Sequence, residues 1–424
     1  MTALRYRPRI ADSMLQRSLQ SRGAVLIQGP KWCGKTTTAI EHSNSVLRLD
    51  EPASRNQNLA LAEIDPGALL VGDTPRLLDE WQLAPTLWDA VRYEVDQRQT
   101  AGQFILTGSS VPARLDQAAH SGTGRIARMR MRPMSLQESG DSAATVSLEQ
   151  LFDGQAAPAH GLDSSIADLA QVLCRGGWPQ TIGQEPEIAL LSAKDYLSEI
   201  VDSDISRVDG TNRNPVLARA ILRSYARFSG QSAALTKVQT DVQATTPVND
   251  KTLRSYFTAL EQIFVIEDLP AWNPNLRSQT AIRSTATRHF VDPSIAAAAL
   301  STGPGGLIKD LNTFGLLFES LCIRDLRVYT DAIGGDVFHY RDKNGLEADA
   351  VVHLHDGRYG LIEIKLGGES AIEDAKKSLH KLRGLIADSK MAEPSFQMVL
   401  TATGSYAFAD TEGIWIVPIT ALGA

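Results

Sequence analysis

The alternation of apolar and polar positions near the start of the chain predicts a repeating α/β unit. Residues 24–50 pass from an apolar run, AVLIQ, through a glycine-containing turn to a helix-compatible stretch and a second apolar run, SVLRLD. This order is typical of a parallel strand-helix-strand unit. Two more strands are expected at 76–80 and 103–109, separated by a helical pattern over 84–98. Together these elements predict one α/β domain, over residues 1–140.

The middle of the chain changes to helical spacing. A stretch rich in Ser, Ala, Gly and Asp at 141–165 indicates a loop or a domain boundary. Apolar residues then recur at helical spacing over 187–206 and 214–230, followed by two further helix-like stretches and two strand-like ones. Three helices and a β-ribbon predict a winged helix-turn-helix, in a helical domain at 165–300.

The last part of the chain predicts a mixed α/β domain over residues 305–424. A helix-like stretch at 313–329 precedes two apolar runs, LEADAVV and YGLIEIKL, which flank the hairpin-sized segment HLHDGR. An amphipathic helix and two more apolar strands follow. This order of helix, hairpin, helix and strands is typical of a restriction-endonuclease-like fold.

Composition and charge exclude several classes of protein. The 424 residues are 43% hydrophobic and 21% charged, which predicts a folded chain. Forty-two basic against 49 acidic residues give a net charge of -7, which argues against a polybasic coat for nucleic acid. The three cysteines form no CxxC pair, so we expect neither a zinc knuckle nor disulfides. Without a signal-like start or a long apolar run, we expect a cytoplasmic protein with no membrane span.

The middle segment has a local charge of the opposite sign. Residues 211–290 contain ten Arg or Lys against five Asp or Glu, a surplus of +5. Basic residues near helical spacing suit the phosphate backbone of DNA, and here they are Arg213, Arg219, Arg223 and Arg227. Arg254 lies early in the candidate recognition helix. A solvated helix face, or a docking surface for an acidic domain, would explain the same surplus.

The turn after the first predicted strand matches the phosphate-binding pattern G-x-x-x-x-G-K-[ST] without a mismatch. Its glycines allow the backbone N–H groups to approach phosphate oxygens, Lys35 supplies a positive charge, and the Thr36 hydroxyl can ligate Mg²⁺. We therefore expect ATP and Mg²⁺ as ligands. The predicted nucleotide-binding residues are Gly29, Pro30, Lys31, Trp32, Cys33, Gly34, Lys35, Thr36 and Thr37.

An acidic pair at the end of a later strand complements this loop. Asp79 is expected to lie near the metal, and Glu80 to polarise the attacking water. The segment ILTGSS ends another strand with small hydroxyl residues, of which Thr107 or Ser109 could sense the γ-phosphate.

Arginines after this strand are the other expected catalytic groups. SGTGRIARMRMRP supplies Arg125, Arg128, Arg130 and Arg132. One of them is expected to reach a phosphate in its own or a neighbouring subunit, with Arg125 as the first candidate. The others can simply alternate along a strand.

A second set of candidate residues lies in the C-terminal hairpin. Because side chains two apart in a strand share a face, Asp349 and Glu363 can meet if the two strands pair, with Lys365 beside them. Two carboxylates suit a divalent metal, the lysine can orient a water, and Glu319 of the preceding helix can complete the cluster. Alternatively, Glu363 and Lys365 are exposed residues of an amphipathic strand.

The chain resembles the bacterial and archaeal AAA-type ATPases that carry a C-terminal DUF4143 region. The resemblance rests on the phosphate-binding loop followed in order by LLDEWQ, ILTGSS, SGTGR, CRGGWPQ, RHFVDPSIAAAAL and LEADAVV with LIEIKLG. It implies an ATPase of the ASCE group and a restriction-endonuclease-like C-terminal fold. By the same resemblance, ATP-site roles fall on Lys35, Thr36, Asp79, Glu80 and Ser109, and nuclease-like roles on Glu319, Asp349, Glu363 and Lys365. In CRGGWPQ, Gly176, Gly177 and Pro179 are expected to set a turn.

These expectations lead to two functional hypotheses. The first is an ATP-hydrolysing protein that binds DNA through residues 211–290 and carries a metal-dependent nuclease domain. The second is a nucleotide-dependent regulator that binds DNA or protein and has an inactive nuclease-like domain. A homo-oligomer is compatible with both.

Overall fold

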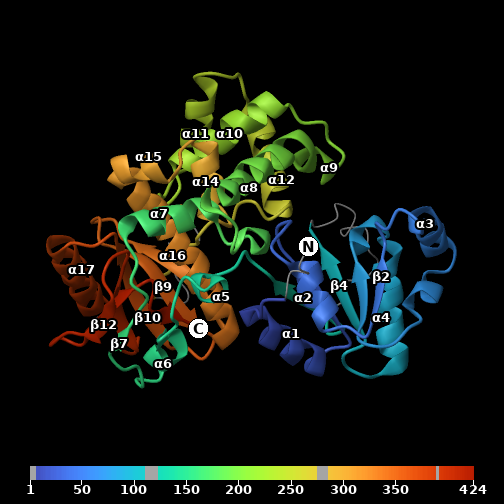
Figure 1. Ribbon diagram of the computed structural model, residues 1–424, viewed down its shortest axis with the longest axis horizontal. Coiled ribbons are helices and arrows are strands. Elements are labelled where there is room, and N and C mark those ends of the chain that lie inside the picture. Colours follow the sequence, from blue (N-terminus) through green and yellow to red (C-terminus); the bar gives the residue numbers. More distant parts are fainter. Residues whose placement is uncertain (1–5, 110–122, 275–284, 388–390) are drawn as a thin grey trace. The chain divides into compact units, whose positions relative to one another are not determined.

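The computed structural model describes residues 6–109, 123–274, 285–387 and 391–424, and the chain forms two compact units (Figure 1). The first unit consists of Met1–Pro133, Ser203–Arg213 and Phe257–Val265. The second consists of Met134–Asp202, Asn214–Tyr256 and Ile266–Ala424. The chain therefore returns to the first unit twice after leaving it.

A parallel sheet of five strands, in the order β2-β3-β4-β1-β5, forms the centre of the first unit. The strands predicted from apolar runs are present: β1 (Ala24–Gln28), β2 (Ser45–Arg48), β3 (Arg76–Asp79) and β4 (Phe104–Gly108), with β5 (Ile126–Arg130) at the edge. Since β4 lies between β1 and β3, the residues that follow these three strands meet at one edge of the sheet.

Helices cover both faces of this sheet, because successive strand residues point to opposite sides. Leu26 belongs to a core with the buried sides of α3 and α4, whereas Ile27 belongs to a core with α1 and α2 (Figure 1). The run AVLIQ is therefore apolar at consecutive positions because both of its faces are covered. The helices are α1 (Ile10–Ser21), α2 (Lys35–Glu41), α3 (Arg55–Ile64) and α4 (Thr86–Arg98), with short turns η1 (Pro66–Leu70) and η2 (Trp81–Leu83).

Helices dominate the second unit up to residue 310. They are α5 (Leu136–Ser139), α6 (Leu148–Phe152), α7 (Ile166–Arg175), η4 (Pro179–Thr181), α8 (Pro186–Glu199), α10 (Pro215–Arg227), α11 (Leu235–Gln243), α14 (Pro293–Ala299) and α15 (Pro304–Lys309). Helix α12 (Asp250–Gln262) runs across the division between the units. The helical pattern predicted over 187–206 is present, but it is not a regular α-helix throughout. Helix α8 ends at Glu199, a π-helical turn covers Ile200–Asp204, and α9 follows at Ile205–Arg207.

The predicted β-ribbon after α12 does not form regular strands in the described part of the chain. Residues 264–274 and 285–291 meet through isolated bridges, such as Ile266 with Phe290 and Leu269 with Thr287. Residues 275–284 lie outside the described residues. The winged helix-turn-helix therefore stays a prediction.

The C-terminal part of the second unit is built on a mixed sheet of seven strands, in the order β7-β12-β13-β11-β10-β9-β8. The predicted hairpin is confirmed: β9 and β10 are antiparallel, with Ala350 opposite Ile362. The strands are β7 (Ala159–His160), β8 (Gly335–Arg341), β9 (Glu347–Leu354), β10 (Tyr359–Lys365), β11 (Phe396–Thr401), β12 (Tyr406–Ala409) and β13 (Ile414–Pro418). A separate two-stranded sheet joins β6 (Val146–Ser147) to β14 (Leu422–Gly423).

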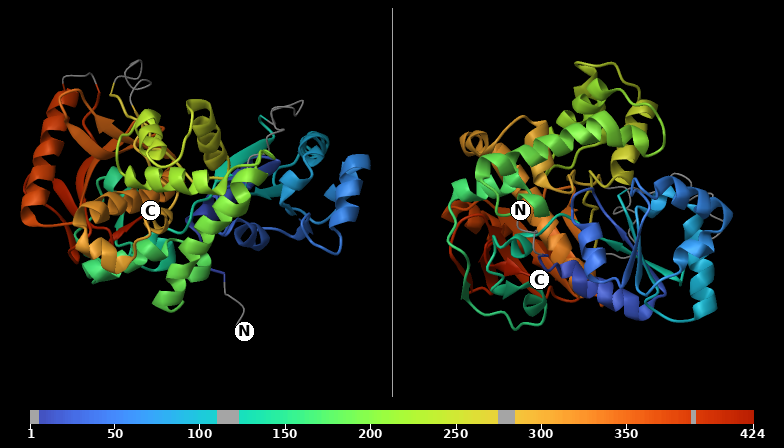
Figure 2. Two further views of the ribbon diagram at one scale, coloured as in Figure 1. Left: turned by 90° about the horizontal axis from the view of Figure 1, so that it is seen from above. Right: turned by 45° about the vertical axis from the view of Figure 1, so that its right-hand side comes forward.

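Two long helices accompany this sheet. Leu379 and Leu382 of α17 (Glu369–Ala387) pack in one core with Val351 of β9 and Leu361 of β10, and Figure 2 shows this helix in orange alongside the red strands. Helix α16 (Leu311–Ile333) contacts β8, β9 and β10. Among the residues that the structure describes, none of the helices is both long and apolar enough to cross a membrane.

Candidate functional site

The phosphate-binding loop joins β1 to α2 at the edge of the sheet where β1, β3 and β4 end. Gly29 has to be glycine, because a Cβ there would lie 2.0 Å from the carbonyl oxygen of Met131. Gly34, at the start of α2, has a φ of +101°, which glycine adopts without strain. The Lys35 ammonium is buried and donates to the Pro30 carbonyl at 2.7 Å. The predicted nucleotide-binding residues thus form one loop and the first turn of α2.

Asp79 at the end of β3 connects this loop to the neighbouring strand. Its Oδ1 accepts a hydrogen bond from Thr36 Oγ1 at 2.8 Å and another from Thr107 Oγ1 at 2.5 Å. The parallel register places Asp79 directly opposite Thr107, so the second bond follows from strand pairing. A hydroxyl beside a buried carboxylate is a set of oxygen donors that fits Mg²⁺. Thr36 and Asp79, the two residues predicted to ligate Mg²⁺ at this site, therefore lie side by side.

Glu80 follows Asp79 at the same edge of the sheet. Its φ is +56°, a left-handed conformation that is strained for a residue other than glycine and is often found at functional sites. Burial raises the pKa of Glu80, the positive charge of Lys35 opposes this, and the side-chain amide of Gln82 donates to its carboxylate. A carboxylate with a raised pKa is better suited to accept a proton from water.

Ser109 and Arg125, the other catalytic residues predicted for the ATP site, lie at opposite ends of the strands of the sheet. Ser109 is buried and follows β4, at the same edge as the loop. Arg125 precedes β5, and its carbonyl accepts a hydrogen bond from Ala24 N at the start of β1. It is thus separated from the loop by a five-residue strand, or roughly 16 Å. Its guanidinium binds Asp96 at 2.8 Å instead. In its own subunit Arg125 therefore does not approach the phosphates, and only a role in a neighbouring subunit stays a prediction.

The other three arginines of this stretch lie in or directly after β5. The guanidinium of Arg128 lies over the Trp88 ring and that of Arg130 over the Phe264 ring, at 5.4 and 5.0 Å. Arg132 comes after β5, at the edge that carries the loop. The predicted alternation along a strand is confirmed for Arg128 and Arg130.

Two residues that support the loop were missed by the sequence analysis. Arg9, just before α1, is buried and donates to the carbonyl oxygens of Cys33 at 2.7 Å and of Arg132 at 2.9 Å. Asp204 binds the ammonium of Lys31. Neither belongs to a recognisable motif, because each acts on the loop from a distant position in the sequence.

The second predicted cluster also assembles, in the C-terminal sheet. The ammonium of Lys365 lies 2.6 Å from Glu363 Oε2 and 3.2 Å from Asp349 Oδ2, and Asp349 also accepts the N–H of Ile364 at 2.7 Å. The side chain of Glu363 is 5% exposed and that of Asp349 is 17% exposed. The alternative that Glu363 lies on an exposed strand face is therefore wrong.

The electrostatics of this cluster involve Glu319 of α16. Burial raises the pKa of Glu363 to about 8, and the charge of Asp349 adds to the increase. Burial and then the charge of Asp349 raise the pKa of Glu319 as well. Burial alone lowers the pKa of Lys365, but the charges of Asp349 and Glu363 outweigh it and raise this pKa overall. The lysine thus stays positive while a proton is readily held on the acidic groups.

A metal ion fits this cluster only in part. In the described part of the chain, no three His, Cys, Asp or Glu side chains come close enough together to form a metal site. Asp349 and Glu363 offer two carboxylates, but the ammonium of Lys365 binds both of them. A divalent cation would have to share these oxygens with the ammonium.

Most arginines predicted to contact DNA already have acidic partners. Arg213 is 2% exposed and binds Asp209, whereas Arg219, Arg227 and Arg254 bind Asp202, Asp241 and Asp250. Arg223 is exposed on α10. Since most of these arginines already form ion pairs with carboxylates, fewer of them can bind phosphate than the count of basic residues indicates.

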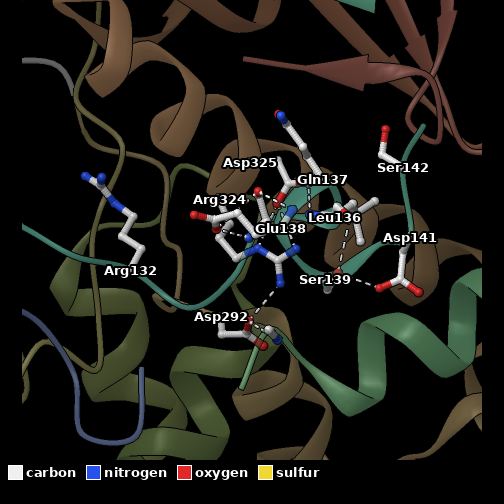
Figure 3. A network of polar contacts seen from close by, with 12 residues as sticks. Arg132, Leu136, Gln137, Glu138, Ser139, Asp141, Ser142, Asp292, Arg324 and Asp325 are labelled. Atoms are coloured by element: carbon white, nitrogen blue, oxygen red, sulfur yellow. Dashed lines mark hydrogen bonds and ion pairs between the residues drawn. The ribbon is translucent and has the colours of Figure 1, made fainter. Parts of the chain in front are cut away.

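The segment CRGGWPQ belongs to a buried network of the second unit (Figure 3). The guanidinium of Arg324 donates to Asp292 at 2.9 Å and to Asp325 at 2.7 Å. Asp292 also accepts the N–H of Gly177 at 3.0 Å, and a Cβ on Gly177 would lie 2.2 Å from the Met134 carbonyl oxygen. The network is structural: it joins α16 to the loops at 134–142 and 176–178.

Comparisons with known proteins agree with this arrangement. Residues 21–140 match the AAA domain family, and residues 314–422 match the domain of unknown function DUF4143. The chain is an AAA-type protein with a C-terminal DUF4143 region. The part between them, residues 166–305, matches another domain of unknown function, DUF8612.

Relatives of this chain include two mycobacterial proteins. The uncharacterized proteins Mb2031c of Mycobacterium bovis and Rv2008c of Mycobacterium tuberculosis are each 23% identical over 420 residues, which cover 97% of this chain and 83% of theirs. Among solved structures, the Walker-type ATPase PABY2304 of Pyrococcus abyssi aligns with a TM-score of 0.42 at 14% identity, over 68% of this chain and 94% of that one. A RuvB variant of Thermotoga maritima aligns with a TM-score of 0.27 at 17% identity, over 61% and 89%.

Proposed function

We propose that the AAA domain binds ATP with Mg²⁺ and hydrolyses it. The observation that carries this proposal is the Thr36–Asp79–Thr107 hydrogen-bond chain, formed beside the phosphate-binding loop with Lys35 and Glu80 at the same edge of the sheet.

Each of these residues has a separate role in the proposed reaction. Lys35 and the loop amides bind the β- and γ-phosphate oxygens. Thr36 and Asp79 would hold Mg²⁺, which neutralises charge on the phosphates when it is bound. Glu80 accepts a proton from the attacking water, because burial has raised the pKa of its carboxyl. Thr107 in β4, or Ser109 directly after this strand, would sense the γ-phosphate.

Two substitutions test the ATPase proposal. Lys35→Ala is expected to weaken nucleotide binding. Glu80→Gln should retain binding and lose turnover by a factor of about 100 or more, which is the usual contribution of a general base. The matched control is Glu94→Gln, which removes a carboxylate that binds Arg98 on α4. Equal phosphate release by Glu80→Gln and the parent protein would remove Glu80 from this role.

A second candidate function is metal-dependent cleavage of DNA by a restriction-endonuclease-like C-terminal domain. The Asp349, Glu363 and Lys365 cluster favours it, because a buried group of this composition is costly unless it serves a site or is fully paired. The alternative is a nucleotide-dependent regulator with an inactive nuclease-like domain. The pairing of Lys365 with both carboxylates supports that alternative.

Plasmid and single-stranded DNA, incubated with Mg²⁺ or Mn²⁺ with and without ATP, separate the two functions. Nuclease activity predicts cleavage that Asp349→Ala abolishes. The control Asp356→Ala changes an exposed residue of the same hairpin and should leave cleavage intact. If no condition gives cleavage, or if Asp349→Ala cleaves as well as the parent, the regulator is the correct function.

DNA binding through residues 211–290 and self-association are further parts of the proposal. Contacts to phosphate predict a DNA affinity that falls as salt rises, and that weakens in Arg223→Ala. If the affinity for DNA does not depend on salt, residues 211–290 are better explained as a docking surface for an acidic domain. In a homo-oligomer, Arg125 of one subunit would face the nucleotide of the next, so Arg125→Ala should lower turnover only at concentrations where the protein associates.

A further inference from the structure

The third residue of the phosphate-binding loop, Lys31, binds a residue that lies far along the chain. Its ammonium nitrogen is 2.5 Å from Oδ1 of Asp204. The Asp204 side chain is 8% exposed and that of Lys31 is 35% exposed. Asp204 belongs to Ser203–Arg213, a segment of the same compact unit as the loop. A buried carboxylate is thus compensated by a lysine of the nucleotide loop.

The segment that carries Asp204 has its own anchor. Asp204 ends a π-helical turn, a rare geometry that is frequent at functional sites. The guanidinium of Arg213 donates to the Ile205 carbonyl at 2.6 Å and to both carboxylate oxygens of Asp209 at 2.8 Å. These contacts hold the segment independently of Lys31. Of the two partners, Lys31 is the more mobile, because its ammonium sits on a flexible four-carbon chain.

We propose that Lys31 is a second cation for the γ-phosphate of ATP, and that Asp204 is its partner when no γ-phosphate is bound. This inference rests on the proposed ATP site. The loop that bears Lys31 is the one that surrounds the phosphates, and Lys31 lies four residues before Lys35. A compact ammonium binds the strongest anion within its reach, so a γ-phosphate competes with Asp204. ADP lacks this phosphate and leaves the ion pair intact.

The exchange would distinguish ATP from ADP and transmit the difference. When Lys31 turns to the γ-phosphate, the buried carboxylate of Asp204 loses the lysine as a partner. The buried position of Asp204 then becomes less favourable. The segment is continuous in the chain with α8 before it and α10 after it. A shift of this segment would thereby link nucleotide state to the helices on either side of it in the chain.

Titration calorimetry of the full-length protein with ATPγS and with ADP, both in Mg²⁺, tests the inference. In Asp204→Asn, ATPγS should bind about fivefold more tightly, because Lys31 no longer leaves a carboxylate, and the ADP affinity should change less than about twofold. In Lys31→Gln, ATPγS affinity should fall about tenfold with a similarly small change for ADP. The matched control Asp202→Asn breaks an exposed ion pair with Arg219 beside the segment and should leave the ratio of the two affinities unchanged.

A charge reversal distinguishes sensing from a purely structural tether. Lys31→Asp combined with Asp204→Lys rebuilds an ion pair but removes the lysine from the loop. ATPγS affinity should then match that of Lys31→Gln, while ADP affinity stays at the parental value. If each single variant changes the affinities for ATPγS and ADP by the same factor, the inference is overturned. If the parent binds neither nucleotide, the ATP site itself is refuted. If it binds both but Lys31→Gln shows no ATPγS-specific loss, only the role of Lys31 and Asp204 is refuted.

Discussion

Replacing Arg324 by methionine is expected to destabilise the second unit strongly. The Arg324 side chain is 2% exposed, and its two partners, Asp292 and Asp325, are fully buried. Methionine keeps much of the apolar volume but removes three charge-assisted hydrogen bonds, of 2.9, 2.9 and 2.7 Å. Two carboxylates are then left buried without their shared cation.

The magnitude follows from this burial. Removing one partner of a buried ion pair costs about 3 to 5 kcal/mol, and two stranded carboxylates place this site at the upper end, about 5 kcal/mol. The loss should depend on pH. Burial raises the pKa of Asp325 and the charge of Arg324 opposes this, so without Arg324 the folded pKa of Asp325 lies further above the unfolded value of about 3.9. An acid with a raised folded pKa loses stabilisation as pH rises between the two values, so the deficit should be larger at pH 8 than at pH 5.

Urea unfolding followed by tryptophan fluorescence at pH 8 and pH 5 measures both effects. Trp178 reports on this region, because its indole N–H donates to Ser294 beside the network. Arg358→Met is the matched control, since the ion pairs of Arg358 with Asp153 and Asp356 are exposed, and it should change the free energy of unfolding far less than Arg324→Met does. Adding Asp292→Asn and Asp325→Asn to the Arg324 variant should recover part of the loss at pH 8.

The reasoning would be refuted by an Arg324→Met protein whose free energy of unfolding is within about 1 kcal/mol of the parent at pH 8. An equal deficit at both pH values would also contradict it, because the loss would then come from packing and not from stranded charge.

Three further predictions concern the packing of Gly177, the hydrogen bond of Thr107 and the titration of Glu363. Gly177→Ala should lower stability by about 1 to 3 kcal/mol in thermal unfolding, because the added Cβ would lie 2.2 Å from the Met134 carbonyl oxygen. Thr107→Val removes a hydrogen bond to Asp79 and should reduce ATP turnover about tenfold in a phosphate-release assay, with nucleotide affinity nearly unchanged. In chelator, the melting temperature of the parent should fall as pH rises from about 5 through 8, because the pKa of Glu363 is raised to about 8. Glu363→Gln should weaken this dependence, and what remains comes from Glu319, whose pKa burial also raises.

Local patterns in the sequence determined the elements and the positions of the chemistry. The spacing of glycines and the terminal Lys35 and Thr36 define the phosphate-binding loop, because backbone conformation there depends on neighbouring residues. The alternation in LEADAVV and YGLIEIKL predicted the hairpin and the common face of Asp349 and Glu363, since strand residues two apart share a face. The π-helical turn Ile200–Asp204 was missed, because its apolar spacing is that of an ordinary helix.

Only the tertiary structure decided which distant residues meet. Asp79 reaches Thr107 because β3 and β4 pair in one particular register, and Asp204 reaches Lys31 because its segment returns to the first unit. Arg125, by contrast, was predicted to reach a phosphate, but β5 runs parallel to β1 and Arg125 precedes it, so the residue lies at the far end of the strand from the loop. Contacts between residues far apart in the sequence depend on strand order, register and chain return, and single-sequence periodicity carries no information about these. Periodicity reports which face of an element is buried, not which other element covers it.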